Sequence, residues 1–126
     1  MVTKIALVAL GGGLGSLCRY LASLGAARLL GNAFPWGTML VNLAGCLMIG
    51  CAFALAERNL LMGPSARLFF MTGFLGGLTT FSSYALESVN AASSGQTVAA
   101  LANVAANNVA GLCLVLAGMA AVKHWT

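Results

Sequence analysis

Long stretches without a charged residue constrain this chain more than any other feature. Four of them contain no Asp, Glu, Lys or Arg: residues 5–18, 29–56, 68–86 and 88–122. A helix that crosses the hydrocarbon core of a bilayer needs about 20 mostly apolar residues. A helix also satisfies its own backbone hydrogen bonds in lipid. The stretches therefore predict an all-α integral membrane protein.

We place four transmembrane helices in the sequence and treat residues 1–126 as a single four-helix membrane domain. The N-terminal segment does not resemble a cleaved signal peptide, because its apolar run continues and no polar mature domain follows. The predicted spans are residues 3–27, 36–56, 66–91 and 97–122.

Composition excludes a water-soluble fold and argues against nucleic acid as a partner. Charged residues make up 6% of the chain and hydrophobic residues 60%, whereas a soluble domain carries about 25% charged residues. The net charge of +4 comes from scattered positions that form no basic patch. Because Lys and Arg are so few, they favour cytoplasmic termini only weakly. Insertion in both orientations is therefore compatible with the sequence.

Small residues in the predicted spans indicate close helix packing. Gly11 and Gly15 form a GxxxG pattern, which lets helix backbones approach each other in lipid. The surrounding GGGLG is not a phosphate-binding loop, because no Gly-Lys-Ser/Thr follows it. The four cysteines lie in apolar spans without a CxxC pair, so we expect neither a disulfide nor a metal–thiolate site.

Polar side chains inside the predicted spans are candidates for function, because burying them in lipid is costly. Thr38 and Asn42 share one helix face at i, i+4, and Asn103 and Asn107 share another. We interpret Asn108 as a residue that hydrogen-bonds between helices. Five hydroxyl side chains cluster in the third span: Thr79, Thr80, Ser82, Ser83 and Tyr84.

These groups do not assemble into an enzyme active site. His124 lies at the C-terminus, and Glu87 is the only candidate for a carboxylate inside the membrane. An arrangement of a nucleophile, a base and a group to orient the base therefore cannot be assembled from these residues. Neutral amide and hydroxyl donors remain, together with the positive edges of aromatic rings. They favour a permeation path for a small anion over the alternative of hydrogen bonds that only hold helices together.

Glycines beside the hydroxyl cluster predict that the third span is broken. Gly73, Gly76 and Gly77 directly precede Thr79 and Thr80. Non-helical backbone at membrane depth is tolerated where it lines a cavity or is buried in protein, and its carbonyls can coordinate a cation such as Na⁺. The alternative is a kinked helix that only packs. A broken helix needs a partner to cover its open carbonyls, which predicts a dimer.

Three motifs resemble the Fluc (CrcB) fluoride-channel family. They are GGGLGSLCRY at 11–20, WGTMLVNLAG at 36–45 and GFLGGLTTFSSYALE at 73–87. The third is highly specific, and the order and spacing of all three fit. The four-span layout extends the resemblance over essentially the whole chain.

The resemblance implies an antiparallel homodimer with dual topology and two fluoride pathways. It also implies a structural Na⁺ at the dimer interface, which is not transported. By motif position, the backbone carbonyls of Gly76 and Thr79 would hold this ion. Arg19 matches the arginine of the first motif, to which we give a structural role.

The resemblance further implies which residues line the fluoride pathway. Asn42 matches the pore asparagine, Thr38 a pore-lining threonine, and Phe81 the first of two pore phenylalanines. Ser82 and Ser83 match the hydroxyl residues beside that phenylalanine.

Two departures from the family pattern stand out. Tyr84 occupies the place of the second phenylalanine, so that it keeps a ring edge and adds a hydroxyl. On the fourth span, where relatives often carry hydroxyl residues, this chain has Asn103, Asn107 and Gly111. We place both asparagines on the pathway as amide donors.

The function implied is passive export of cytoplasmic fluoride across a bacterial or archaeal inner membrane, which relieves fluoride toxicity. Three alternatives remain. A small four-span multidrug transporter of dual topology would need a glutamate in the first span, and none is present. A non-transporting assembly subunit would leave the polar side chains unexplained. The chain could also form one subunit of a heterodimeric channel.

Overall fold

The computed structural model describes residues 1–58 and 62–125 and contains only helices and turns in that part of the chain. Three helices there are long and apolar enough to cross a membrane. The helices α1 (Val2–Leu30) and α2 (Trp36–Glu57) are continuous. The third consists of α6 (Thr97–Ala105), a π-helical stretch η2 (Ala106–Ala110) and α7 (Gly111–Trp125). The predicted all-α class is confirmed.

The third predicted span is broken, as the glycines and hydroxyls indicated. It begins with α3 (Pro64–Arg67), continues as the π-helical η1 (Leu68–Leu75) and ends as α4 (Gly76–Leu78). Thr79 and Thr80 are extended, and α5 (Phe81–Ser93) follows them. The span therefore consists of two half-helices, neither of which is long enough to cross a membrane alone.

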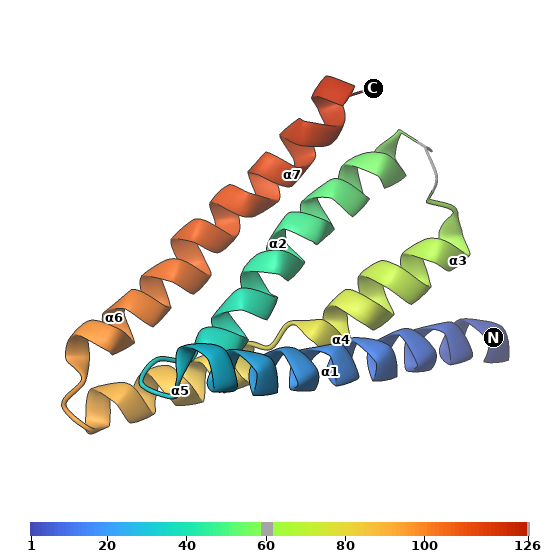
Figure 1. Cartoon of the computed structure of the whole chain (residues 1–126). Coiled ribbons are helices and arrows are strands. Elements are labelled where there is room, and N and C mark those ends of the chain that lie inside the picture. The colour runs from blue at the N-terminus through green and yellow to red at the C-terminus, as the bar shows by residue number, and fades with distance from the viewer. Residues whose placement is uncertain (59–61, 126) are drawn as a thin grey trace.

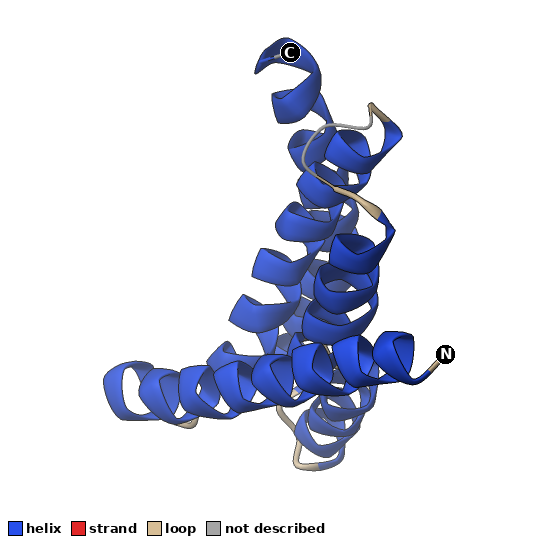
Figure 2. Cartoon of the chain, turned by 90° about the vertical axis from the view of Figure 1, so that its right-hand side faces the viewer, coloured by secondary structure: helices blue, strands red, loops and turns tan. Residues whose placement is uncertain are grey.

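The helices form two packed groups that meet near the break (Figure 1). α2 runs along α7, while α1 lies across the bundle and packs against η1 and α4. Figure 2 shows the same wide crossing of α1 from the side. The second half-helix, α5, packs against α6.

Glycines allow α1 to approach the first half of the broken span. A Cβ at Gly15 would overlap the carbonyl oxygen of Phe74, and one at Gly11 would overlap that of Phe69. The GxxxG interpretation as a packing motif is confirmed. Glycines also allow α2 and α7 to pack closely. A Cβ at Gly50 or Gly118 would meet the backbone of the opposite helix.

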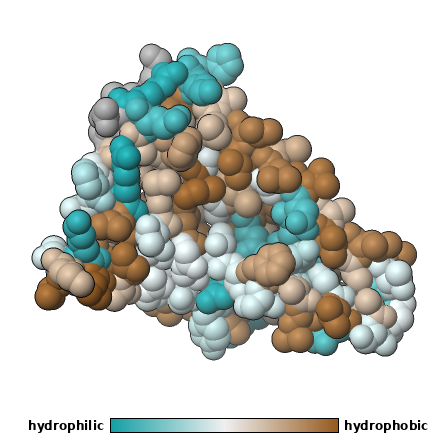
Figure 3. All heavy atoms as spheres, turned by 180° about the vertical axis from the view of Figure 1, so that it is seen from behind, coloured by the Kyte–Doolittle hydropathy of each residue, from teal (hydrophilic) through white to brown (hydrophobic). Residues whose placement is uncertain are grey.

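Apolar side chains form large areas of the face seen in Figure 3, between patches of hydrophilic residues. Large residues on α1 and α7 face outward, including Leu10 at 64% exposure and Leu112 at 70%. The buried apolar cluster is small and centres on Val41, Leu75 and Leu78. Such a surface fits a chain surrounded by lipid rather than by water.

Arg67 links the end of α2 to the start of the third span. Its Nε donates to the Met62 carbonyl at 2.9 Å, and its Nη2 donates to the Ala56 carbonyl. The second contact satisfies a carbonyl in the last turn of α2, where a cation is favourable.

Candidate functional site

The site is built around the two extended residues of the break. Thr79 has φ −84° and ψ 154°, and Thr80 has φ −151° and ψ 119°. The Thr80 side chain caps α5, since its Oγ1 accepts from the Ser83 N–H at 3.2 Å. The positive end of α5 and its first hydroxyls are therefore fixed beside the break.

Asn42 holds the break against α2. Its Oδ1 accepts from the Thr80 N–H at 2.8 Å, and its Nδ2 donates to the Thr80 carbonyl at 3.1 Å. One amide thus replaces both backbone partners that Thr80 would have in a continuous helix. The same Nδ2 donates to Asn107 Oδ1 at 2.8 Å.

The hydrogen bonds continue from Asn42 along the fourth span. Asn107 Nδ2 donates to Asn103 Oδ1 at 2.9 Å, and Asn103 Nδ2 donates to Ser88 Oγ at 2.9 Å. Asn103 is only 1% exposed. Each amide donates to the next residue in one direction, so the asparagines of α2, α6 and η2 form a connected chain that ends on α5.

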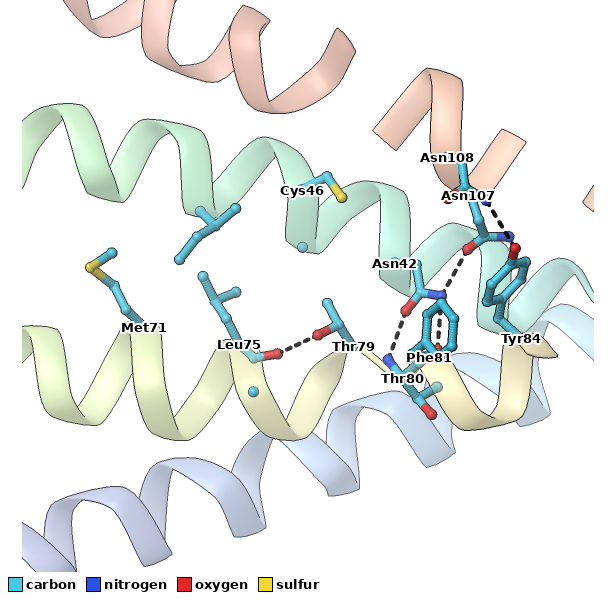
Figure 4. A pocket seen from close by; sticks show the side chains of 13 residues that line it. Asn42, Cys46, Met71, Leu75, Thr79, Thr80, Phe81, Tyr84, Asn107 and Asn108 are labelled. Atoms are coloured by element: carbon cyan, nitrogen blue, oxygen red, sulfur yellow. Dashed lines mark hydrogen bonds between the residues drawn. The ribbon is translucent and has the colours of Figure 1, made fainter. Parts of the chain in front are cut away.

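A cavity of about 380 Å³ lies beside this chain (Figure 4). It contains no charged side chain among its lining residues. The polar and aromatic groups that line it include Asn42, Thr79, Phe81, Tyr84, Asn107 and Asn108. The space at the helix break is therefore lined by uncharged side chains, with amide, hydroxyl and aromatic groups beside apolar ones.

The two aromatic residues of the motif lie at the cavity with different exposure. Phe81 is 76% exposed and Tyr84 is 9% exposed. Their rings meet edge to face, with centroids 5.3 Å apart and planes inclined by 67°. The hydroxyls of Ser82 and Ser83 lie within 3.3 Å of Thr80 Oγ1 and do not line the cavity.

Thr38 lies apart from the cavity, one helical turn away from Asn42. Its hydroxyl donates to Glu87 Oε1 at 2.6 Å. The other oxygen of that carboxyl group, Glu87 Oε2, is buried and has no hydrogen-bond partner among the described residues. The structure therefore separates Thr38 from the residues around Asn42 and pairs it with Glu87.

The carbonyls predicted to bind Na⁺ have lost their helical donors. In a continuous helix, Gly76 O would accept from the Thr80 N–H, and Thr79 O would accept from the Ser83 N–H. The Thr80 N–H instead donates to Asn42, and the Ser83 N–H donates to the Thr80 side chain. Both carbonyls are thereby left to accept from another partner, and carbonyl oxygen is a ligand suited to a hard cation.

The surroundings of Arg19 and Asn108 were only partly predicted from the sequence. Arg19 lies half-buried on α1, and its side chain forms no hydrogen bond or ion pair within residues 1–58 and 62–125. Asn108 bonds between helices as expected, since its Nδ2 donates to Tyr84 Oη at 2.9 Å, but it also lines the cavity. Its neighbour Asn107 also lines the cavity. In the π-helical turn of η2, the angle between adjacent side chains is smaller than in an α-helix, so both residues can face the same space.

A family model described as "CrcB-like protein, Camphor Resistance (CrcB)" matches residues 6–119. The chain belongs to the CrcB family. All three motifs, at residues 11–20, 36–45 and 73–87, lie inside the matched region.

Bacterial relatives agree with the assignment to the CrcB family over nearly the full length. The chain is 43% identical to a protein of Cereibacter sphaeroides over 99% of its own length and 98% of the relative's. It is 43% identical to one from Agrobacterium fabrum and 42% identical to one from Rhizobium johnstonii, each over 93% of this chain and 94% of the relative. All three are named "Fluoride-specific ion channel FluC". These names are those of an ion channel and not of an enzyme, which confirms the prediction made from the residues.

Proposed function

We propose that this CrcB-family chain is a fluoride-selective channel that passively exports cytoplasmic fluoride. The observation that carries the proposal is the uncharged cavity at the helix break, whose lining includes three asparagines and two aromatic residues. The names of relatives at 42–43% identity over at least 93% of the chain support the choice of fluoride.

Neutral donors suit an anion that must bind and then leave. A fixed positive charge would hold fluoride tightly, whereas amides and ring edges offset part of its lost hydration without trapping it. The N-terminus of α5, beside Phe81 and Ser82, adds a positive partial charge. The proposed pathway runs past Asn42, Phe81, Tyr84 and Asn107, with Thr38, Ser82, Ser83 and Asn103 as further contacts along it.

Fluoride binding at Asn42 requires an exchange of partners. Both donor contacts of its Nδ2 are already made, to the Thr80 carbonyl and to Asn107 Oδ1. We infer that the anion takes the place of Asn107 Oδ1 while Asn42 keeps its hold on Thr80. Each passing ion then exchanges one hydrogen bond for another, which keeps the barrier low.

A structural Na⁺ forms part of the proposal. Gly76 O and Thr79 O lack their helical donors and lie beside the same break. Two copies of the chain related by a two-fold axis would bring four such carbonyls together. The ion would neutralise the carbonyl dipoles and tie the two breaks to each other.

The working unit that we propose is an antiparallel homodimer inserted with dual topology. Gly76 and Phe81 are exposed in the single chain although they border the break, and a partner would cover them. The small number of charged residues gives each copy little preference for one orientation. A heterodimer with a related chain is the second candidate for the assembly.

The membrane potential supplies the driving force. Neutral HF enters a cell from an acidic medium and ionises at cytoplasmic pH, so fluoride accumulates as the anion. A negative-inside potential expels it with about 2.3 kcal/mol per charge per 100 mV. The relatives come from bacteria, and we accordingly place the protein in the inner membrane.

The multidrug-transporter alternative is not favoured. It calls for an intramembrane carboxylate on the first helix, and α1 contains no Asp or Glu. The named relatives are fluoride channels.

The test is ion efflux from proteoliposomes that contain the purified protein and Na⁺. We expect rapid fluoride release under a K⁺ diffusion potential and negligible chloride release from matched vesicles. Equal release of both anions would overturn the proposed selectivity. No release of either from a folded homodimer would overturn the homodimeric channel, and recovery on mixing with a second family member would then identify the heterodimer.

A further inference from the structure

Tyr84 carries a hydroxyl in addition to the aromatic ring that a phenylalanine would also supply. The residue is only 9% exposed. A buried phenol normally forms a hydrogen bond, because leaving it unpaired is costly. In this structure its partner is Asn108, which donates to Tyr84 Oη at 2.9 Å.

The direction of that bond decides what the hydroxyl can still do. Asn108 Nδ2 carries two hydrogens and no lone pair for accepting, so Tyr84 Oη must be the acceptor. The second hydrogen of Nδ2 goes to the Val104 carbonyl at 2.8 Å, which fixes the amide. The phenolic hydrogen is therefore not used by Asn108, and no acceptor for it is found among the described residues.

Because Tyr84 lines the cavity, the cavity offers space for an acceptor of the phenolic hydrogen. Tyr84 and Asn108 both line it, together with Asn42 and Asn107 (Figure 4). A hydroxyl that already accepts a hydrogen bond is polarised and becomes a better donor. Fluoride is small and accepts hydrogen bonds strongly, so an O–H at this position suits it better than it suits chloride.

We propose that the Tyr84 hydroxyl donates a hydrogen bond to fluoride in the cavity and that Asn108 is the positioning residue that turns it there. This inference rests on the proposed function, since it needs fluoride to reach the cavity. The proton stays on the phenol oxygen throughout, and only the hydrogen-bond acceptor changes.

Tyrosine content makes a direct test possible. The chain has only two tyrosines, and the other, Tyr20, is 61% exposed on α1. In the Tyr20→Phe protein, tyrosine labelled with ¹³C at the Cζ position reports on Tyr84 alone. The sample is the detergent-solubilised assembly with Na⁺, titrated with NaF or NaCl.

We expect the Cζ signal to shift saturably with NaF and to stay unchanged with NaCl at the same concentration. Asn108→Leu should raise the half-saturating fluoride concentration about tenfold, which corresponds to roughly 1.4 kcal/mol. Asn90→Leu on α5 serves as the matched control, because Asn90 is exposed and does not line this cavity. It should leave the titration unchanged.

Fluoride efflux from the same proteins separates this inference from the proposed function. Tyr84→Phe, Asn108→Leu and the double variant should lower fluoride efflux by similar factors, since each removes the same oriented donor. Intact efflux from the Tyr20→Phe protein without a fluoride-dependent Cζ shift would overturn the role of the hydroxyl and leave the channel standing. Additive losses in the double variant would overturn the positioning role of Asn108. Absence of efflux from the native chain would overturn the proposed function and this inference with it.

Discussion

At the scale of single residues, Asn42 combines a structural and a proposed conducting role. Its carbonyl accepts from the Thr80 N–H, while its Nδ2 faces two acceptor oxygens, those of Thr80 and Asn107. An aspartate would place an oxygen against those two acceptors and a negative charge beside the path. Aspartate at position 42 cannot donate the two hydrogen bonds of Nδ2, and its negative charge repels fluoride.

Asn42→Asp should therefore reduce fluoride efflux at least tenfold, because a difference of about 1.4 kcal/mol already changes a rate tenfold. The measurement is the initial rate of fluoride release from proteoliposomes at matched protein content. Asn32→Asp, which makes the same change at an exposed position outside the cavity, should retain the native rate. Undiminished efflux in the Asn42 variant would place this residue off the pathway.

Thr80→Val tests the cap of α5 with a side chain of nearly equal shape. Removing the hydroxyl leaves the Ser83 N–H without its partner, and loss of an N-cap side chain costs about 1 kcal/mol. We expect a lower midpoint of thermal unfolding, followed by tryptophan fluorescence in detergent. Thr72→Val, at an exposed position of η1, is the control; an equal loss there would show that the cap contributes nothing.

The residue types around the cavity could be predicted from the sequence, but their pairing could not. The i, i+4 spacing of Asn103 and Asn107 indicates a shared helix face, and a resemblance to known channels indicates Asn42 and Phe81. Which amide bonds to which depends on the crossing of α2, α5 and η2, which no local pattern specifies. The pairing of Thr38 with Glu87, 49 positions apart, is of this kind.

At the scale of elements, α1 depends on two glycines for its contact with η1 and α4. Gly15→Ala would push a Cβ into the Phe74 carbonyl, which cannot withdraw without moving η1. Forcing extra volume into a packed contact typically costs about 1–3 kcal/mol. We expect the unfolding midpoint in detergent to fall.

Gly13→Ala is the matched control for the α1 contact. An added Cβ there meets nothing within 4 Å, and alanine favours a helix by about 1 kcal/mol over glycine. Its midpoint should stay the same or rise. A fall as large as that of Gly15→Ala would mean that α1 does not pack through this face.

The broken third span was predictable, because glycines stand beside hydroxyl residues that can replace helical hydrogen bonds. The π-helical turns η1 and η2 were not. Their residues have no preference that separates a π-turn from an α-turn, so the widening is set by packing across helices. For that reason the place of Asn108 at the cavity could not be read from the i, i+4 pattern.

At the scale of the whole molecule, Gly76 offers a test of the proposed dimer. The residue is exposed, and a Cβ built on it meets nothing within 4 Å of the same chain. Valine there is compatible with the fold of one chain, but its branched side chain would stand where a partner's break is proposed to dock. Gly76→Val should shift the population toward monomer and abolish the proposed stabilisation by Na⁺.

The measurement for Gly76→Val is the oligomeric state by light scattering in detergent, with Na⁺ or with N-methylglucamine. Gly13→Val, at an open position of α1, should behave as the native chain does. An intact Gly76→Val dimer that still responds to Na⁺ would contradict the proposed place of the ion.

The division of the third span into two short helices also affects how the protein is made. A translocon admits segments by their length and apolar content, and α5 offers only Phe81–Ser93, which includes Glu87 and several hydroxyls. Such a segment gains little from entering lipid alone. The helix α6, with which it packs, follows it in the chain, so α5 reaches its final depth only after the fourth span has been synthesised. We therefore expect that a ribosome stalled before residue 97 would leave α5 outside the hydrocarbon core.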